Sequence, residues 1–532
     1  MAEFDYIIVG GGSAGCAVAA RLAEDQRLRV CLLEAGKSDD QWLIKAPFGT
    51  AAMMPTRLNN WAFATVPQPG LNGRCGYQPR GKALGGSSST NAMIYNRGHR
   101  WDYDHWAALG NPGWSYAEVL PYFKKSEHNE TLDDAYHGQG GPLNVANPRS
   151  DNPFQQIFLR AAQQAGFPLT ADFNGAEQEG CGIYQLTQKN GERWNAARAY
   201  LHPHLARHSN LQVITGAQAQ RILFKGKRAT GVEFRQGGQI RSLQATGEII
   251  LSAGAFQSPQ LLLLSGIGAG RELQAQGRAV VHDLPGVGKN LQDHIDYVLN
   301  YTARSLDLVG LSLAGSLRLL KEVRRYRRAR RGMIATNFAE GGAFLRRTPQ
   351  SPAPDFQLHF VIGMVDDHSR RLHWGHGYSC HVCLLRPQSR GTVSLASADP
   401  AAAPRIDPQF FAHGDDLAAM LEGFKLTRRL MDAPAFAALR ERELYSAGLD
   451  ADEQILEELR NRCDTIYHPV GTCRMGSDAL AVVDAELRVH GIEGLRVVDA
   501  SIMPSLIGGN TNAPAMMIGE KAASLIRAAR YD

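Results

Sequence analysis

The sequence predicts an α/β protein that joins a Rossmann-like dinucleotide-binding domain to a second domain of the α+β class. A short, apolar, β-branched run at residues 6–9 ends in three glycines and precedes an alanine-rich stretch. A second apolar run at 29–33 ends in an acid, Glu34. Later runs at 356–360 and 391–395 alternate between apolar and polar residues, which is typical of a sheet with one exposed face. With 532 residues, 44% of them hydrophobic, the chain is long enough for two or more domains.

The N-terminal segment has the pattern strand, tight turn, helix, second strand. Gly10 permits the turn, Gly12 lets backbone N–H groups approach a pyrophosphate, and Gly15 lets the helix sit close to the strand. The positive end of that helix then faces the phosphates. Glu34 lies about 20 residues beyond the glycines, where an acid binds ribose, so a buried unit whose glycines serve packing alone is the less favoured alternative. The predicted dinucleotide contacts in this segment are Gly10, Gly12, Ser13, Ala14, Gly15, Glu34 and Ala35.

The elements that follow are predicted from composition and period. A loop-rich region broken by prolines extends from Glu34 to about Pro79. Residues 101–125 predict helices whose aromatic face packs in a core. The strand-like runs that return to the dinucleotide-binding domain lie at 211–215, 220–224, 231–234 and 248–254.

The net charge of the chain is small, but one segment is strongly basic. A net charge of +5, from 57 basic and 52 acidic residues, argues against nucleic acid as a partner. Residues 318–331 hold eight Lys or Arg and one acid, and they predict a basic amphipathic helix. Its apolar side is expected to combine Leu317, Leu320 and Arg324 with Val323 and Tyr326 beside them. Two interpretations stay open: a solvated helix whose arginines pair with acids elsewhere, and a helix that docks on an anionic membrane near a quinone.

No metal site is predicted. Cys380 and Cys383 form a C-x-x-C without a second pair, and their strand-like surroundings favour packing over redox chemistry. The Asp and His residues between 366 and 376 match no attested ligand spacing. The chain opens on a strand without a basic, apolar leader and has no apolar run of membrane-spanning length. We therefore expect a cytoplasmic protein, with the inner face of the membrane as the place of any docking.

Two long motifs carry a family resemblance. The Gly- and Ser-rich run at 81–91 is compatible with a flexible link or with a concave array of N–H and hydroxyl donors. Together with the run at 254–268 it resembles the two signatures of the glucose-methanol-choline (GMC) oxidoreductases. The runs at 286–294 and 497–504 are similar to the same family, so the resemblance covers essentially the whole chain. It is most similar to the bacterial FAD-dependent alcohol dehydrogenases and choline dehydrogenase-like members.

The resemblance implies a discontinuous FAD-binding domain and a substrate-binding domain built on an antiparallel sheet that roofs the active site. The FAD-binding domain is expected to span 1–153, 197–300 and 464–532, and the substrate-binding domain 154–196 and 301–463. Thr90 stands where flavinylated relatives have histidine, which implies non-covalent FAD. The further FAD contacts that the resemblance implies are Gly81, Leu84, Gly85, Gly86, Ser88, Asn91, Ala253, Asp499 and Ala500.

The chemistry implied is oxidation of a primary alcohol to an aldehyde. The hydroxyl proton needs an acceptor with a pKa near neutrality, which suits histidine. Among 17 histidines, the match at 465–476 selects His468 as general base, with hydride passing to flavin N5. Asn512 matches the second active-site position, where its amide holds the alcohol oxygen. Electrons are expected to leave to a quinone or another acceptor.

Rival functions stay open at this point. An alcohol oxidase that uses oxygen, a choline dehydrogenase and a flavin-containing lyase share the implied fold, and a non-catalytic dinucleotide-binding module is a further class. Glu340 aligns with a recurring family glutamate, and either a contact in the site or a structural hydrogen bond explains it.

Overall fold

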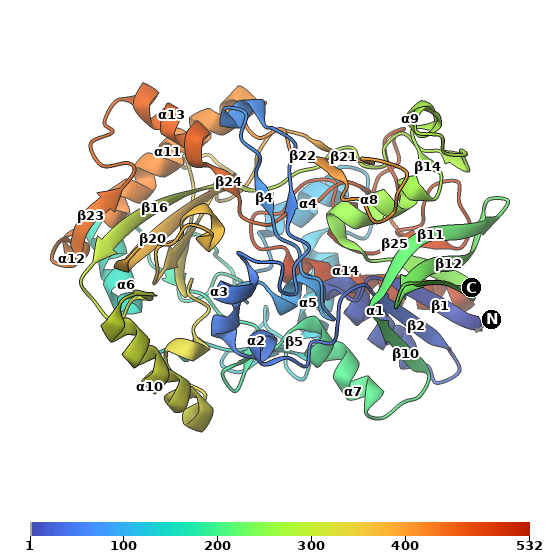
Figure 1. The fold of residues 1–532 in the computed structure, drawn as a ribbon, viewed down its shortest axis with the longest axis horizontal. Coiled ribbons are helices and arrows are strands. Elements are labelled where there is room, and N and C mark those ends of the chain that lie inside the picture. Colours follow the sequence, from blue (N-terminus) through green and yellow to red (C-terminus); the bar gives the residue numbers. More distant parts are fainter. Residues whose placement is uncertain (1–2, 532) are drawn as a thin grey trace.

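The computed structural model describes residues 3–531 and contains two large sheets at opposite ends of the molecule (Figure 1). The first sheet has seven strands in the order β10-β2-β1-β13-β12-β11, with β25 also paired to β13. Its strands β10, β2, β1, β13 and β25 are parallel, and β12 and β11 are antiparallel, so the predicted Rossmann-like architecture is confirmed. These strands are β1 Glu3–Val9, β2 Val30–Glu34, β10 Leu211–Thr215, β11 Ala217–Lys225, β12 Arg228–Gln236, β13 Gln239–Leu251 and β25 Leu495–Val497.

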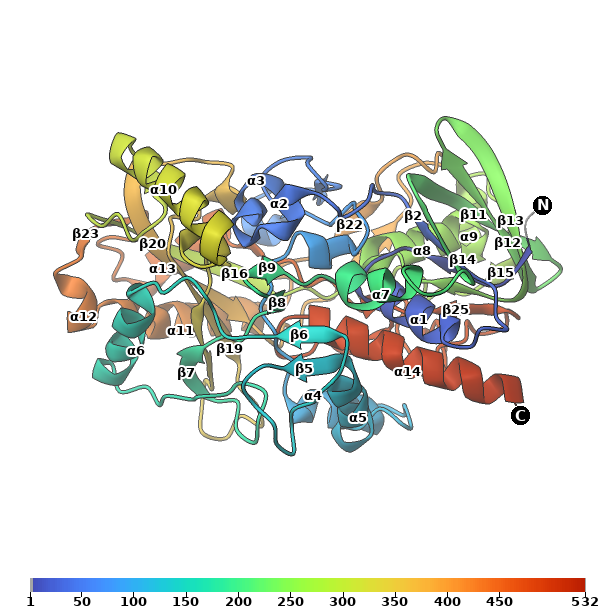
Figure 2. The ribbon, with the colours of Figure 1, turned by 90° about the horizontal axis from the view of Figure 1, so that it is seen from below.

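The first and the last helix lie side by side against this sheet. Helix α1, Ser13–Ala23, follows the glycine turn, and α14, Asn512–Tyr531, packs along it (Figure 2). The Arg21 guanidinium donates to both carboxylate oxygens of Glu520 on α14 at 2.8 Å. The two ends of the sequence therefore build one layer of the domain.

The second sheet is antiparallel, as predicted, in the order β23-β16-β20-β19-β18-β7, with β17 paired to β20 and β24 to β16. The expected boundary at residue 300 falls within β16, and the division into domains stays a prediction. The strands are β7 Gly180–Ile183, β16 Ile295–Ala303, β17 Gly310–Leu311, β18 Gly341–Leu345, β19 Phe356–Val361, β20 Gly375–Leu384, β23 Arg440–Leu444 and β24 Asp464–Thr465.

The expectation that this sheet has an exposed face is wrong. Strand β19 is buried along its whole length. Its Phe356, Leu358 and Phe360 belong to an apolar cluster with residues of α6, Phe154–Gln164, and α11, Gly414–Met431. The alternate residues face the other way, where Gln357 reaches Asn510. The run at 391–395 also lies outside this sheet, because β21, Thr392–Ser394, pairs only with β22, Arg405–Asp407.

The other elements connect and cover the sheets. The aromatic packing expected for 101–125 is confirmed, because Trp106 in the helix 100–108, Phe123 in the helix 116–126 and Trp114 between them are all buried. The remaining helices are α2 Trp42–Lys45, α3 Thr50–Met53, α4 Arg100–Ala108, α5 Tyr116–Ser126, α7 His202–Leu205, α8 Gly254–Leu264, α9 Gly270–Ala275, α12 Pro434–Ala437 and α13 Asp452–Arg462. The remaining short strands are β3 Phe63–Ala64, β4 Tyr77–Gln78, β5 Glu127–Asn129, β6 Leu143–Val145, β8 Gln188–Lys189, β9 Glu192–Arg193, β14 Ile267–Gly268 and β15 His282–Asp283.

The predicted basic helix exists as α10, Leu313–Ala329, on the outside of the second domain (Figure 1). The Ser312 hydroxyl caps its N-terminus by accepting the Gly315 N–H at 2.9 Å. Leu317 and Leu320 are exposed on one side, as expected. Val323 and Tyr326 do not join them, because they pack against the body of the protein. Within residues 3–531, no helix combines the length and the apolar composition needed to cross a membrane.

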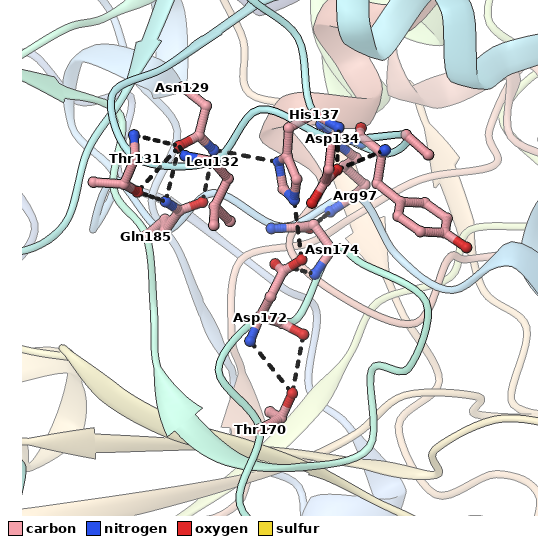
Figure 3. Close-up of polar contacts among 12 residues, drawn as sticks. Arg97, Asn129, Thr131, Leu132, Asp134, His137, Thr170, Asp172, Asn174 and Gln185 are labelled. Atoms are coloured by element: carbon pink, nitrogen blue, oxygen red, sulfur yellow. Dashed lines mark hydrogen bonds and ion pairs between the residues drawn. The ribbon is translucent and has the colours of Figure 1, made fainter.

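A buried polar cluster ties the segment around β5 to residues 170–174 (Figure 3). His137 Nε2 bonds Asp172 at 3.0 Å, and its Nδ1 bonds Glu127 at 3.3 Å. Burial alone would lower the pKa of His137, but the hydrogen bonds to these carboxylates outweigh it and raise the pKa to about 9. Arg97 lies in the same cluster and forms an ion pair with Glu127. The cluster therefore holds positive charge against the buried Glu127 carboxylate and the partly buried Asp172 carboxylate.

Candidate active site

A cavity of about 660 Å³ runs from the first sheet to the second. At one end it is lined by Glu34, the last residue of β2, and by Ala35. His468 lies on its wall, and Leu311 of β17 and Ser316 of α10 line the other end. The cavity thus joins the predicted dinucleotide site to the predicted catalytic histidine.

The glycine turn after β1 has the shape that a pyrophosphate requires. Gly10 has φ of +107°, which favours glycine, and a Cβ on Gly15 would collide with the Gly10 carbonyl oxygen. A Cβ on Gly12 would meet only Ser252 O at 3.9 Å, so this position is open toward the cavity. Gly12 is the residue before α1, whose N-terminal N–H groups therefore face the same space.

Glu34 ends β2 with its carboxylate held in place. Its Oε2 accepts the Gly11 N–H at 2.9 Å and its Oε1 accepts the Gly36 N–H at 2.6 Å. Burial raises the pKa of Glu34 to about 7, against the opposing effect of these bonds. Because each oxygen has a lone pair to spare, the side chain can also accept ribose hydroxyls.

The Gly- and Ser-rich run packs directly on the glycine turn. Gly85 N–H donates to Gly11 O at 2.7 Å, and a Cβ on Gly86 would lie 2.7 Å from Gly12 Cα. Ser88 Oγ donates to Gly85 O at 2.5 Å and accepts the Ala196 N–H at 3.0 Å. It therefore connects the loop to the segment at Ala196. The run is therefore part of the dinucleotide cradle, and the flexible link is excluded.

The structure brings most of the predicted cofactor contacts to the cavity wall. Those that line it are Gly10, Gly12, Ser13, Ala14, Glu34, Ala35, Gly81, Gly86, Asn91, Ala253, Asp499 and Ala500. Those that do not are Gly15, Leu84, Gly85 and Ser88, which support the residues in front of them. Asp499 also holds the start of α8, because its Oδ2 accepts the Gly254 N–H at 2.9 Å and the Ser258 hydroxyl at 2.5 Å.

His468 is held at three points. Its backbone N–H donates to Asp293 Oδ1 at 2.9 Å, its Nδ1 lies 2.9 Å from His294 Nδ1, and its Nε2 lies 3.2 Å from Asn510 Nδ2. The preceding residue, Tyr467, has φ of +74°, a strained conformation held by the Arg80 guanidinium on its carbonyl. Burial, followed by the nearby His294 and His359, lowers the pKa of His468 well below its usual range. The imidazole is therefore neutral and able to accept a proton.

The two asparagines near the C-terminus have different contacts. Asn512, the predicted one, lines the cavity, and its Oδ1 accepts the Ser13 hydroxyl at 2.7 Å. Asn510, which the sequence reasoning missed, contacts His468. His294 and Asp293 were missed too, although the family-like run at 286–294 contains both. Nothing local in the sequence links that run to His468.

The cavity wall beyond His468 carries little negative charge. Among the described residues, the carboxylates that line the cavity are Glu34 and Asp499, and both lie at the dinucleotide end. Glu340 is not on the wall, because its carboxylate accepts hydrogen bonds from Ser150, Gln155 and Thr336. This supports the structural explanation of Glu340. From the second sheet, His359 and Val361 of β19 and His381 of β20 line the cavity, together with Met364 and Ile466.

The comparisons with known proteins agree with this architecture. The GMC oxidoreductase models match residues 4–296 and 387–519. The chain belongs to the GMC oxidoreductase family. A Pseudomonas putida alcohol dehydrogenase [acceptor] is 46% identical to this GMC oxidoreductase over 98% of this chain and 95% of the relative. The human mitochondrial choline dehydrogenase is 44% identical over 99% of this chain and 90% of the relative.

Solved structures extend the agreement to the fold and the cofactor. A structure on FAD modification in Aspergillus oryzae RIB40 formate oxidase has a TM-score of 0.92 and 29% identity, covering 100% of this chain and 99% of that one. This GMC oxidoreductase is thus an enzyme that acts on CH–OH groups, and FAD is the cofactor that its family and its cradle support.

Proposed function

We propose that this enzyme oxidises an uncharged primary alcohol to the aldehyde with FAD, that His468 is the general base, and that electrons leave to a quinone or another acceptor. The observation that carries the proposal is a buried, neutral imidazole on the wall of the cavity that begins at the dinucleotide cradle. A base of this kind contributes roughly 10²- to 10⁴-fold to the rate.

The residues of the cradle fit FAD. The N-terminus of α1 at Gly12 and Ser13 would hold the pyrophosphate, and Glu34 would accept the ribose hydroxyls. Thr90 lines the cavity but has no nucleophilic nitrogen, so FAD is held without a covalent bond. The bound flavin supplies the acceptor for the hydride.

The protein's own groups handle the proton and the oxygen of the alcohol. His468 Nε2 takes the hydroxyl proton, because His294 holds Nδ1 on the buried side. The Oδ1 of Asn512 is engaged by Ser13, so its Nδ2 is the side that can donate to the alcohol oxygen as negative charge develops. The apolar wall around Val361 and Ile466 excludes water from this point.

The cavity favours an uncharged alcohol over choline. A buried quaternary ammonium needs a carboxylate or the open face of an aromatic ring. Within the described residues, no carboxylate lines the wall on the His468 side, and the charged side chains that line the cavity away from the dinucleotide end are Arg80 and Arg318. The aromatic rings on the wall already have partners. Trp61 is stacked on Phe63 and has Lys82 4.0 Å from its centroid, Phe256 lies edge-on to Phe63, and Tyr467 is tilted against His368. Phe48 and Phe338 pack on each other, with centroids 4.9 Å apart.

Anaerobic flavin reduction tests the proposal. Uncharged primary alcohols of increasing chain length and choline are each mixed with the oxidised holoenzyme. We expect the second-order reduction rate for the best alcohol to exceed that for choline by at least roughly 100-fold. Faster reduction by choline would reverse the specificity, and no reduction by any alcohol would support a lyase or a non-catalytic protein. Oxygen consumption during turnover would support an oxidase.

We also propose that α10 docks this enzyme on an anionic membrane, with the cavity mouth toward the lipid. Leu313, Leu317 and Leu320 are 80%, 64% and 65% exposed, and they follow one side of the helix. Trp374, 76% exposed, is paired through its backbone with Leu311, just before the helix. Leu311 and Ser316 line the cavity, so this apolar edge is continuous with its opening.

The basic residues of α10 fall into two groups. Arg318 pairs with Asp307, and Arg325 pairs with Asp151. Within the described part of the chain, Lys321, Arg324, Arg327 and Arg328 are exposed and form no ion pair. The solvated-helix alternative therefore accounts for only part of the charge. Each unpaired cation near an anionic surface contributes on the order of 1 kcal/mol, attenuated by salt.

Co-sedimentation with liposomes tests the docking. Wild type should pellet with anionic vesicles at low salt and be released at high salt. A variant with Lys321, Arg324, Arg327 and Arg328 changed to Gln should stay in solution. The matched control removes four exposed cations from the first domain, Lys225, Lys227, Arg235 and Arg271, and should pellet like wild type. Loss of binding in the control as well would show a non-specific charge effect. Binding by all three proteins would show that the four basic residues of α10 are not needed for docking.

A further inference from the structure

A chain of hydrogen bonds passes through His468 from one backbone carbonyl to another. On the buried side, His468 Nδ1 lies 2.9 Å from His294 Nδ1, and His294 Nε2 lies 3.0 Å from Leu385 O. On the cavity side, His468 Nε2 lies 3.2 Å from Asn510 Nδ2. Asn510 Oδ1 in turn accepts from Gln357 Nε2 at 2.9 Å.

The buried end fixes which nitrogen carries each proton. A carbonyl oxygen can only accept, so His294 Nε2 must carry a hydrogen toward Leu385. Burial lowers the pKa of His294 to about 3, so its ring is neutral and its Nδ1 has no hydrogen. The 2.9 Å contact then requires that His468 Nδ1 is the donor. His468 is left with an unprotonated Nε2.

The contacts at the cavity end indicate the same tautomer of His468 independently. The Tyr184 hydroxyl donates to Leu358 O at 2.7 Å, so its oxygen accepts from Gln357 Nε2 at 3.2 Å. This orients the Gln357 amide, which places its N–H toward Asn510 Oδ1. Asn510 therefore presents its own N–H to His468, and a donor at this point requires an Nε2 lone pair.

We propose that His294 is a positioning residue that holds His468 in the Nδ1–H tautomer, so that the Nε2 lone pair on the cavity side is free to take the proton of the substrate. His294 is fully buried and does not line the cavity, so it acts only through His468. The substrate hydroxyl takes the place of the Asn510 donor at Nε2. This inference rests on the proposed role of His468.

The tautomer can be observed directly. Holoenzyme labelled with ¹⁵N-histidine is studied by magic-angle-spinning NMR, where protonated and unprotonated ring nitrogens resonate apart. The signals of His468 are those missing from the His468→Gln variant. We expect Nδ1 protonated and Nε2 unprotonated in wild type. The opposite assignment would overturn the proposal whatever the activity of the enzyme.

Two variants separate positioning from a structural role. In His294→Asn the amide oxygen can still accept from His468 Nδ1, and in His294→Leu nothing can. We expect the rate of flavin reduction to fall about 10- to 100-fold in His294→Leu and to stay within about threefold of wild type in His294→Asn, with equal FAD content. Equal losses in both variants would show a packing role instead. If His468→Gln reduces flavin at the wild-type rate, the proposed role of His468 as general base is wrong. This outcome is distinct from a failure of the proposal for His294.

Discussion

Ser13 Oγ donates to Asn512 Oδ1 at 2.7 Å, which joins the glycine turn after the first strand to the first residue of the last helix. The bond orients the Asn512 amide so that its N–H can face the cavity. We expect Asn512→Ala to slow flavin reduction by about 10²-fold, because it removes the proposed donor to the developing alkoxide. Ser13→Ala removes only the hydrogen bond that orients the Asn512 amide and should slow flavin reduction by less than about tenfold. Stopped-flow reduction checks the order, and a larger loss in Ser13→Ala would contradict it.

His468→Ala should retain FAD and lower the rate of flavin reduction by roughly 10² to 10⁴. Because burial keeps the pKa of His468 well below 6.5, the base is lost only as the pH falls through that lowered value. The wild-type reduction rate should therefore be flat between pH 6.5 and 9. Unchanged reduction in the variant, or a rate that rises steeply across neutral pH, would remove His468 from the mechanism.

FAD should be released from the denatured enzyme without cleavage of a covalent bond. Thr90 lines the cavity and has no nucleophilic nitrogen, and its hydroxyl lies 3.4 Å from the Ser87 carbonyl. Acid precipitation of the holoenzyme should release the yellow colour to the supernatant. Colour that stays in the pellet would show a covalent link through another residue.

Gly15→Ala should damage the dinucleotide cradle. The added methyl would collide with the Gly10 carbonyl and force α1 away from β1. We expect lower FAD content and a melting temperature lower by roughly 5–10 °C. Gly414→Ala is the matched control, because a Cβ there meets nothing within 4 Å at the start of α11. A similar loss in both variants would argue against a specific clash.

His137 should make stability depend on pH. Its pKa is raised to about 9 in the folded protein, against about 6.5 in an unfolded chain, so the folded state binds the extra proton between these values. The stabilisation is complete below pH 6.5 and is lost as the pH rises through 9. Melting temperatures should therefore fall less between pH 6.5 and 9 in His137→Gln than in wild type. Parallel curves for the two proteins would contradict the prediction.

The sequence predicts best where the determinants are local. The run at 211–215 coincides with β10, and the turn at Gly10 needs only a strand, three glycines and a helix in succession. The buried state of β19 escaped prediction, because α11, which helps cover it, comes more than 50 residues later. The same holds in the site. His294 and His468 are 174 positions apart, so no spacing rule links them.

The pairing of α1 with α14 has a consequence for how the chain is made. Strand β1 and helix α1 leave the ribosome before β13, which lies more than 200 residues later, and before α14, which lies later still. Until α14 is made, the side of α1 that packs on it has no permanent cover, and the nascent chain must keep that side from wrong partners. Because Asn512 at the start of α14 lines the cavity and bonds Ser13, we expect a chain that ends before α14 to bind FAD poorly.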